Sequence, residues 1–218
     1  MTKPRVIETD QGIQGDFEVG AYDQMQRRFR DKGWMETKAI IKAGLTTGTV
    51  LEVGPGPGYL GLEWLKQTNA TRLTGLDISP DMIALARRNA AEYGLEERVE
   101  YIESSGAGMP FPDGGFDGVF SNGSLHEWAD VAQTLSEMWR VLRPGGRLFL
   151  SDLRRDMLPP IKWFMWLATR PTAIRPGLVT SVRASYTPAE AEDIMRGSHF
   201  PAFTVDANPM GIEVTATK

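Results

Sequence analysis

The apolar positions of residues 49–153 alternate between two periods. Short apolar runs typical of buried strands occupy 49–53, 72–78, 98–104, 116–122 and 147–153. Segments with apolar residues three and four apart, typical of helices, lie among them at 59–67, 81–93 and 128–142. Strands and helices that alternate with short connections predict an α/β fold, a parallel sheet with helices on both faces.

Several local signals fix where these helices begin and end. Ser79 is a good N-cap, Pro80 suits the first turn, and the charge of Asp81 favours the positive end of the helix. Gly94 is a typical C-terminal glycine, and the run Arg143-Pro144-Gly145-Gly146 ends the helix before the fifth strand. Upstream, residues 17–44 predict two helices divided at Gly33, after a polar arm of sixteen residues.

Composition restricts the class of protein. A chain of 218 residues with 41% hydrophobic and 24% charged residues predicts one folded, soluble domain. The net charge of -4 argues against a nucleic-acid partner. No cysteine is present, which excludes disulfides and cysteine nucleophiles, and two histidines argue against a transition-metal site. No apolar run approaches the ~20 residues of a membrane span, and we expect a cytoplasmic location.

Residues 51–61, LEVGPGPGYLG, form a glycine-rich turn directly after the first strand. The turn contains the dinucleotide spelling G-x-G-x-x-G between Gly56 and Gly61. In that fingerprint the first glycine follows the strand directly, so counting begins at Gly54. The position of the third glycine is then occupied by Tyr59. Glu52 would also repel a pyrophosphate, whereas it suits a cationic ligand. An NAD-dependent oxidoreductase is therefore the less favoured alternative.

Polar residues also follow the other strands, at the sheet edge where ligands bind in parallel sheets. Asp77 can accept hydrogen bonds from ribose hydroxyls, and residues 104–107 (SSGA) offer hydroxyl and backbone N–H groups to a base. The fourth strand ends in SNGSLHEW, residues 121–128. Two acids without a basic residue near the glycine turn favour a positively charged nucleoside.

Four blocks in one order carry a resemblance to a known family: VLEVGPGPG, LTGLDISPDMI, MPFPDGGFDGVFSN and VLRPGGRLFLSD, which together span residues 49–152. The chain resembles the class I S-adenosylmethionine-dependent methyltransferases, and within them the small-molecule enzymes related to the quinone and sterol methyltransferases. The tail, from TPAEAEDIMRGSHFPAFTV to GIEVTATK, is similar to the family's last helix and closing antiparallel hairpin. The resemblance implies a Rossmann-like, seven-stranded, mostly parallel sheet with a helical lid.

The expected organisation is a single methyltransferase domain. Its parts would be an N-terminal helical lid (1–44), a cofactor-binding core (45–152), a substrate cap (153–186), and the last helix with the C-terminal hairpin (187–218). S-adenosylmethionine would be the cofactor and S-adenosylhomocysteine the product.

The resemblance also implies a set of cofactor-binding residues. Glu52 and the backbone of the glycine turn would hold the methionine end, Asp77 the ribose, and Ile78 the adenine, while Tyr22 would fold over the cofactor. The family often has an aspartate at Ser105, whose contact with the adenine amino group the serine or the following N–H groups would replace. The full set is Tyr22, Glu52, Gly54, Gly56, Asp77, Ile78, Ser105, Gly106, Ala107 and Asn122.

Methyl transfer from a sulfonium is an in-line displacement that depends largely on alignment of donor and acceptor. A base contributes only when the acceptor arrives protonated. His126, after the fourth strand, and Tyr186 are the candidate catalytic residues. Each has a structural alternative, because His126 could cap a helix and Tyr186 precedes the capping box of Thr187 and Glu190.

Residues 153–186 should decide the substrate. Six basic residues lie between 153 and 183 against one acid, and residues 163–167 form the apolar run WFMWL. The cap could enclose an apolar or aromatic substrate with an anionic group, contacted by Arg154, Arg155, Trp163 and Trp166. It could instead form a homodimer interface or pack onto the sheet, or lie on an anionic membrane surface.

The favoured function is S-adenosylmethionine-dependent methylation of a small molecule, by a monomer or a homodimer. Oxygen, nitrogen, carbon and sulfur acceptors all remain open. The cysteine-dependent arsenic methyltransferases are excluded because the thiolates are absent. The alternative from another class is a non-catalytic S-adenosylmethionine-binding regulatory protein of the same fold.

Overall fold

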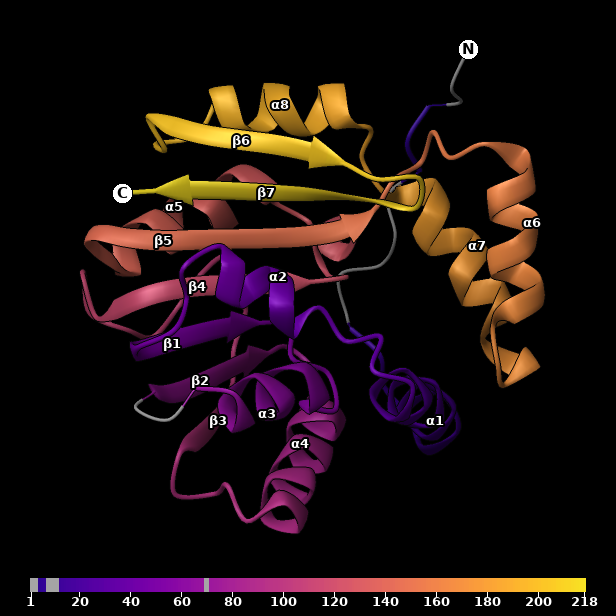
Figure 1. The fold of residues 1–218 in the computed structure, drawn as a ribbon, viewed down its shortest axis with the longest axis horizontal. Coiled ribbons are helices and arrows are strands. Elements are labelled where there is room, and N and C mark those ends of the chain that lie inside the picture. The colour runs from indigo at the N-terminus through magenta and orange to yellow at the C-terminus, as the bar shows by residue number, and fades with distance from the viewer. Residues whose placement is uncertain (1–3, 7–11, 69–70) are drawn as a thin grey trace.

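The computed structural model describes residues 4–6, 12–68 and 71–218. Its centre is a seven-stranded sheet in the order β3-β2-β1-β4-β5-β7-β6 (Figure 1). The strands are β1 (Gly48–Val53), β2 (Thr71–Asp77), β3 (Val99–Glu103), β4 (Phe116–Asn122), β5 (Leu142–Leu153), β6 (Ala202–Ala207) and β7 (Gly211–Thr217). β7 runs antiparallel to both of its neighbours, and the other pairings are parallel. The predicted mostly parallel sheet and its closing hairpin are thus confirmed.

Helices lie on both faces of this sheet (Figure 1). Residues of α2, α3 and α4 pack with sheet residues in two buried clusters on one face, and residues of α5 and α8 pack in a third on the other. The helices are α1 (Asp16–Asp31), α2 (Thr37–Lys42), α3 (Tyr59–Lys66), α4 (Pro80–Tyr93), α5 (Val131–Val141), α6 (Pro159–Ala168), α7 (Arg175–Ala184) and α8 (Pro188–Arg196). Two short 3-10 turns, η1 (Leu125–Glu127) and η2 (Thr172–Ile174), precede α5 and α7.

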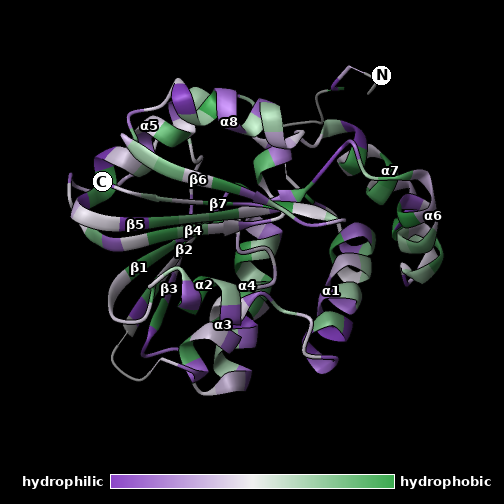
Figure 2. Ribbon diagram, turned by 45° about the horizontal axis from the view of Figure 1, so that its top comes forward, coloured by the Kyte–Doolittle hydropathy of each residue, from purple (hydrophilic) through white to green (hydrophobic). Residues whose placement is uncertain are grey.

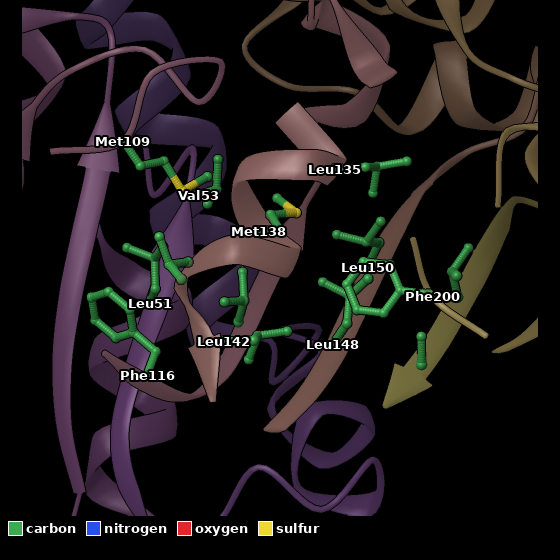
Figure 3. Close-up of a cluster of buried hydrophobic side chains, with 14 of the residues drawn as sticks. Leu51, Val53, Met109, Phe116, Leu135, Met138, Leu142, Leu148, Leu150 and Phe200 are labelled. Carbon is green, nitrogen blue, oxygen red and sulfur yellow. The ribbon is translucent and has the colours of Figure 1, made fainter. Parts of the chain in front are cut away.

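The largest buried cluster fills the space between the sheet and α5 (Figure 3). Leu51 and Leu148 of the strands meet Leu135 and Met138 of α5, and each of these side chains is at most 1% exposed. The alternation of strands β1 and β5 accounts for this, since every second residue points to the same face. The cluster anchors the strands whose ends carry the polar residues.

On the opposite face of the sheet, Trp64 of α3 packs against the strands. Its ring is fully buried and lies 5.8 Å from the ring of Phe120. The indole Nε1 donates a hydrogen bond of 2.9 Å to the carbonyl of Leu45, so the polar atom of this large side chain is satisfied inside the core.

The helix boundaries follow the expected caps, with one correction. Ser79 Oγ accepts from the Met82 amide at 3.2 Å, and Gly94 ends α4 with a φ of 63°. The helix predicted for 128–142 begins only at Val131, because Asp130 acts as its N-cap and accepts from the Gln133 amide at 2.9 Å. Residues 125–127 form η1 instead.

The glycine-rich turn between β1 and α3 has a backbone that other residues rarely adopt. Gly54, Gly56 and Gly58 have φ values of 72°, 52° and 82°. Gly58 is the N-cap of α3, and Gly61 already lies within that helix. The dinucleotide spelling that includes Gly61 therefore crosses a structural boundary, whereas the three alternating glycines form one turn.

Replacing Gly58 with alanine should destabilise the fold by about 1–2 kcal/mol, because a Cβ is unfavourable at this positive φ. That Cβ would also lie 2.5 Å from the Tyr101 hydroxyl. Gly20→Ala is the matched control, because Gly20 lies in α1 and a Cβ added there would meet nothing within 4 Å. The control should be neutral or gain about 0.5–1 kcal/mol. Urea unfolding measures the free energy of unfolding of both variants. A Gly58→Ala variant as stable as Gly20→Ala would contradict the role of the turn.

Candidate functional site

An open cleft lies at the carboxyl ends of β1, β2 and β4, where parallel sheets bind ligands. Its empty volume, counted out to the solvent at its mouth, is about 960 Å³. Eight of the ten predicted cofactor residues line it: Tyr22, Gly54, Gly56, Asp77, Ile78, Ser105, Gly106 and Ala107. These residues come from separate parts of the chain, and the fold brings them together.

Asp77, the last residue of β2, connects two backbone segments at the base of this cleft. Its Oδ2 accepts from the Gly56 amide at 3.0 Å, and its Oδ1 accepts from the Ser79 amide at 2.9 Å. Burial raises the pKa of the carboxyl, and the backbone N–H groups oppose that rise. Asp77 thereby fixes the glycine turn relative to the start of α4 and still presents a carboxylate to the cleft.

One wall of the cleft is apolar and the far end is polar. Ile78 is 43% exposed, which is unusual for an isoleucine and leaves its side chain open to a ligand. Beyond it, Ser105 Oγ accepts from the Ala107 amide at 3.2 Å, so these residues form a tight polar turn. An apolar surface next to hydroxyl and amide groups suits a flat heteroaromatic base.

Gly12, Ile13 and Tyr22 line the other side of the cleft. Tyr22 of α1 lies close to Gly56, since a Cβ on that glycine would be 3.4 Å from the Tyr22 ring. Burial raises the pKa of the Tyr22 phenol well above its usual range, and the charge of Glu127 adds to the effect. Ser79 Oγ also donates to the Ile13 carbonyl at 2.6 Å, which ties this segment to the cleft.

Glu52 does not line the cleft. Glu52 lies two residues after Val50 in β1, so both side chains are on the same face of the sheet. Val50 packs with α3 on that face, and the Glu52 side chain therefore points toward α3. It is 2% exposed, and its Oε2 has no hydrogen-bond partner among the residues that the structure describes. Burial raises the pKa of Glu52 to about 8, the charge of Asp77 contributes, and the Gly61 amide opposes the shift. The Glu52 carboxyl thus lies beside Gly61 of α3, outside the cleft lining, and its contact with a cofactor stays a prediction.

The side chain of Asn122 is directed away from the cleft, and the contact expected from its backbone stays a prediction. Its amide donates to Glu36 Oε2 at 3.0 Å and to Ser151 Oγ at 2.6 Å. Burial raises the pKa of the Glu36 carboxyl. The next residues in the chain, Gly123 and Ser124, line the cleft in its place.

His126 is buried beside the cleft rather than in its wall. Its Nδ1 lies 2.9 Å from the carboxylate of Asp152, whose Oδ2 also accepts from the His126 amide at 2.8 Å. Its Nε2 lies 3.8 Å from Oε1 of Glu127, and Glu127 does line the cleft. The three side chains form a connected row from β5 to the cleft.

The other predicted catalytic and substrate residues lie outside the cleft lining. Tyr186 is half-buried, with the guanidinium of Arg5 4.3 Å from its ring centre. Arg155 is 6% exposed and pairs with Glu190, and Arg154 pairs with Asp156 at 2.7 Å. Both arginines therefore make contacts within the fold. Trp163 and Trp166 are 64% and 41% exposed on α6.

Sequence reasoning missed several residues of the cleft. Besides Ser104, which the sequence had indicated, the lining also includes Gly12, Ile13, Val53, Leu76, Met82, Gly123, Ser124, Glu127, Trp128, Ala129, Asp130 and Thr134. The segment 121–128 is recognisable as the end of a strand, but Asn122 and His126 are its conspicuous polar residues, and Glu127 and Trp128 are not. No group of three or more metal-ligating side chains occurs within residues 4–6, 12–68 and 71–218.

Comparison with known proteins shows the family of this chain. The family described as "Methyltransferase domain" matches residues 51–150. A demethylmenaquinone methyltransferase of Thermus thermophilus is 39% identical over 134 residues, which are 60% of this chain and 60% of that protein. One from Symbiobacterium thermophilum is 30% identical over 169 residues, 69% of this chain and 67% of the relative.

A solved structure of a SAM-dependent methyltransferase from Aquifex aeolicus has the same fold. It superposes with a TM-score of 0.68 at 20% identity, over 87% of this chain and 92% of that one. Among four curated relatives, the Thermus protein included, the chain spans only 45–60% of their own length. These comparisons confirm the resemblance stated above and give no support to an oxidoreductase.

The buried Glu52 should make stability depend on pH. Its pKa is about 8 in the folded chain, against about 4.5 in an unfolded one, so its contribution is fully present below about pH 4.5 and is lost as pH rises through 8. Glu52→Gln removes this dependence. Between pH 5 and pH 8.5, the unfolding free energy of the unchanged protein should fall by roughly 4 kcal/mol relative to the variant.

Urea unfolding across that range measures the difference. Glu97→Gln, at an exposed surface position, is the matched control and should follow the unchanged protein. Parallel curves for the unchanged protein and Glu52→Gln would show that Glu52 is ionised in the folded state.

Proposed function

The chain belongs to the class I S-adenosylmethionine-dependent methyltransferases, and from this premise we propose that it transfers a methyl group to a small molecule. The charge of the cleft is the observation that carries the proposal. The lining contains Asp77, Glu127 and Asp130 and no lysine, arginine or histidine. Such a cleft suits a sulfonium cation and an adenosine, and it would repel the pyrophosphate of a dinucleotide.

The residues present fit the cofactor part by part. Asp77 offers carboxylate oxygens to the two ribose hydroxyls, and Ile78 with Met82 offers apolar surface to the adenine. At Gly54 and Gly56 a ligand can approach the main chain closely. The cofactor would supply an electrophilic methyl group, and the protein would align it with the acceptor.

The acceptor that we favour is a quinone-type ring in its reduced, hydroxylated form. The two curated relatives described above are demethylmenaquinone methyltransferases, which supports this class. Such a ring would react at carbon once a ring hydroxyl has lost its proton. The C–S bond of the sulfonium would break as the new C–C bond forms, its electron pair would leave with S-adenosylhomocysteine, and the same ring carbon would then lose its hydrogen. The first and last steps each release a proton, so a base near the cleft would accelerate the reaction.

We assign Glu127 as that base and His126 as the residue that positions it. Glu127 lines the cleft, and its Oε1 lies 3.8 Å from Nε2 of His126. Asp152 holds the His126 ring through Nδ1 and the backbone amide, so the ring cannot easily turn. The imidazole thereby presents Nε2 to the Glu127 carboxylate from a fixed position.

Transfer of a radiolabelled methyl group to a panel of acceptors tests the proposed function. The panel contains reduced naphthoquinones without the ring methyl group, together with catechols, amines and thiols. Label on a naphthoquinol carbon supports the full proposal, and label on another acceptor supports methyl transfer but overturns the acceptor. No transfer to any acceptor, despite tight S-adenosylhomocysteine binding, would favour the non-catalytic alternative.

Asp77→Ala should weaken S-adenosylhomocysteine binding by more than ~1 kcal/mol, because two hydrogen bonds to the ribose are lost. Calorimetric titration measures this change. Glu103→Ala is the matched control, since Glu103 ends the neighbouring strand β3 but does not line the cleft. It should bind like the unchanged protein. Equal affinity for Asp77→Ala would refute the assignment of this residue.

Glu127→Gln should lower kcat on the identified acceptor about 100-fold, with S-adenosylhomocysteine affinity within about threefold of normal. Asp130→Asn is the control, because Asp130 also lines the cleft and asparagine can replace it as a helix cap. His126→Asn should shift the acidic limb of the pH–rate profile. A Glu127→Gln enzyme with full kcat would exclude this residue as the base.

A further inference from the structure

The cap helices α6 and α7 lie at the outer edge of the molecule, beyond the end of the sheet (Figures 1 and 2). Among the described residues, eleven large hydrophobic side chains are exposed, and six of them lie between 158 and 179. Those six are Leu158, Trp163, Phe164, Trp166, Leu167 and Val179. None of them lines the cleft. The exposed apolar surface of this protein is therefore concentrated on its cap.

On α6 four of the large apolar side chains face outward. At 3.6 residues per turn, Trp163, Phe164, Trp166 and Leu167 fall within an arc of about 160°. They are 64%, 60%, 41% and 43% exposed, and none of the ten residues of α6 is fully buried. The side of the helix that carries Ile161 and Met165 is the less exposed one. An ordinary surface helix turns its apolar stripe to the core, whereas α6 leaves its widest apolar face exposed.

The same segment carries a concentrated positive charge. Residues 157–189 contain four basic residues and no acid, whereas the rest of the chain has 20 Lys and Arg against 28 Asp and Glu. Arg175 lies 4.2 Å from the ring centre of Trp166, and its Nη2 donates to the Leu167 carbonyl at 3.0 Å. Arg170 donates to the same carbonyl at 2.6 Å. Two cations thus lie at the edge of the aromatic surface.

We propose that this cap surface, formed by the outward face of α6 with Arg170 and Arg175, docks on an anionic lipid bilayer. Tryptophan and other apolar side chains next to arginine match the boundary between acyl chains and negatively charged headgroups. With ten residues α6 is too short to span a bilayer, and no helix of the described residues is long and apolar enough to cross one. The helix would lie in the plane of the surface.

Charge decides between a membrane and a second copy of this chain. In a two-fold dimer the cap surface would meet itself, so Arg170 and Arg175 at its edge would lie against the equally basic surface of the partner. An anionic bilayer neutralises them. The inference is independent of the acceptor proposed above, because it concerns α6 and its basic rim and not the cleft.

Flotation of the full chain with lipid vesicles tests the proposal. Vesicles of phosphatidylcholine with about 30% phosphatidylglycerol should bind the protein at least tenfold better than pure phosphatidylcholine, and salt should weaken this binding. Arg170→Glu with Arg175→Glu should reduce it at least tenfold. Lys38→Glu with Arg88→Glu, an equal change of charge at exposed positions on α2 and α4, should leave most of it intact.

The aromatic contribution is tested separately. Trp163→Ser with Phe164→Ser should reduce vesicle binding at least tenfold, while Trp34→Ser, at a tryptophan that is 58% exposed outside the cap, should not. Thermal unfolding checks that each variant is folded. Absence of binding to anionic vesicles would overturn the proposal. So would a dimer, seen by analytical ultracentrifugation, that the Trp163→Ser and Phe164→Ser changes dissociate.

Discussion

The hydrogen bond that the Gly56 amide donates to the Asp77 carboxylate is the interaction on which the site depends. It joins the turn after β1 to the end of β2, and the second oxygen of the same carboxylate fixes the start of α4. Three glycines with positive φ allow the backbone to come this close. The turn after β1, the end of β2 and the start of α4 are thereby joined at the base of the cleft. The remaining cleft residues are arranged around them.

Much of this arrangement follows from local sequence. Strand and helix periods predicted the parallel core, and the capping residues Ser79 and Thr187 act as their sequence indicates. Alternating glycines after the first strand and an acid after the second identified the cleft, because residues that end parallel strands meet at one edge. The closing hairpin came from the resemblance.

Other features could not be read from the chain alone. The direction of Glu52 depends on the register of β1 within the sheet, which turns its carboxyl toward α3 rather than toward the cleft. Arg155 looked like an anion-binding residue, but the contact with Glu190 requires two segments 35 residues apart to meet. The outward aromatic face of α6 likewise depends on which side of that helix packs on the protein. Such long-range choices are made by tertiary packing.

The central claim is that an acidic cleft on a methyltransferase fold binds a sulfonium nucleoside and not a dinucleotide. Calorimetric titration of the unchanged protein with S-adenosylmethionine, S-adenosylhomocysteine and NAD tests it most directly. We predict saturable micromolar or tighter binding of the first two, at one site per chain, and no detectable binding of NAD. Binding of NAD, or no binding of S-adenosylmethionine or S-adenosylhomocysteine, would contradict the account.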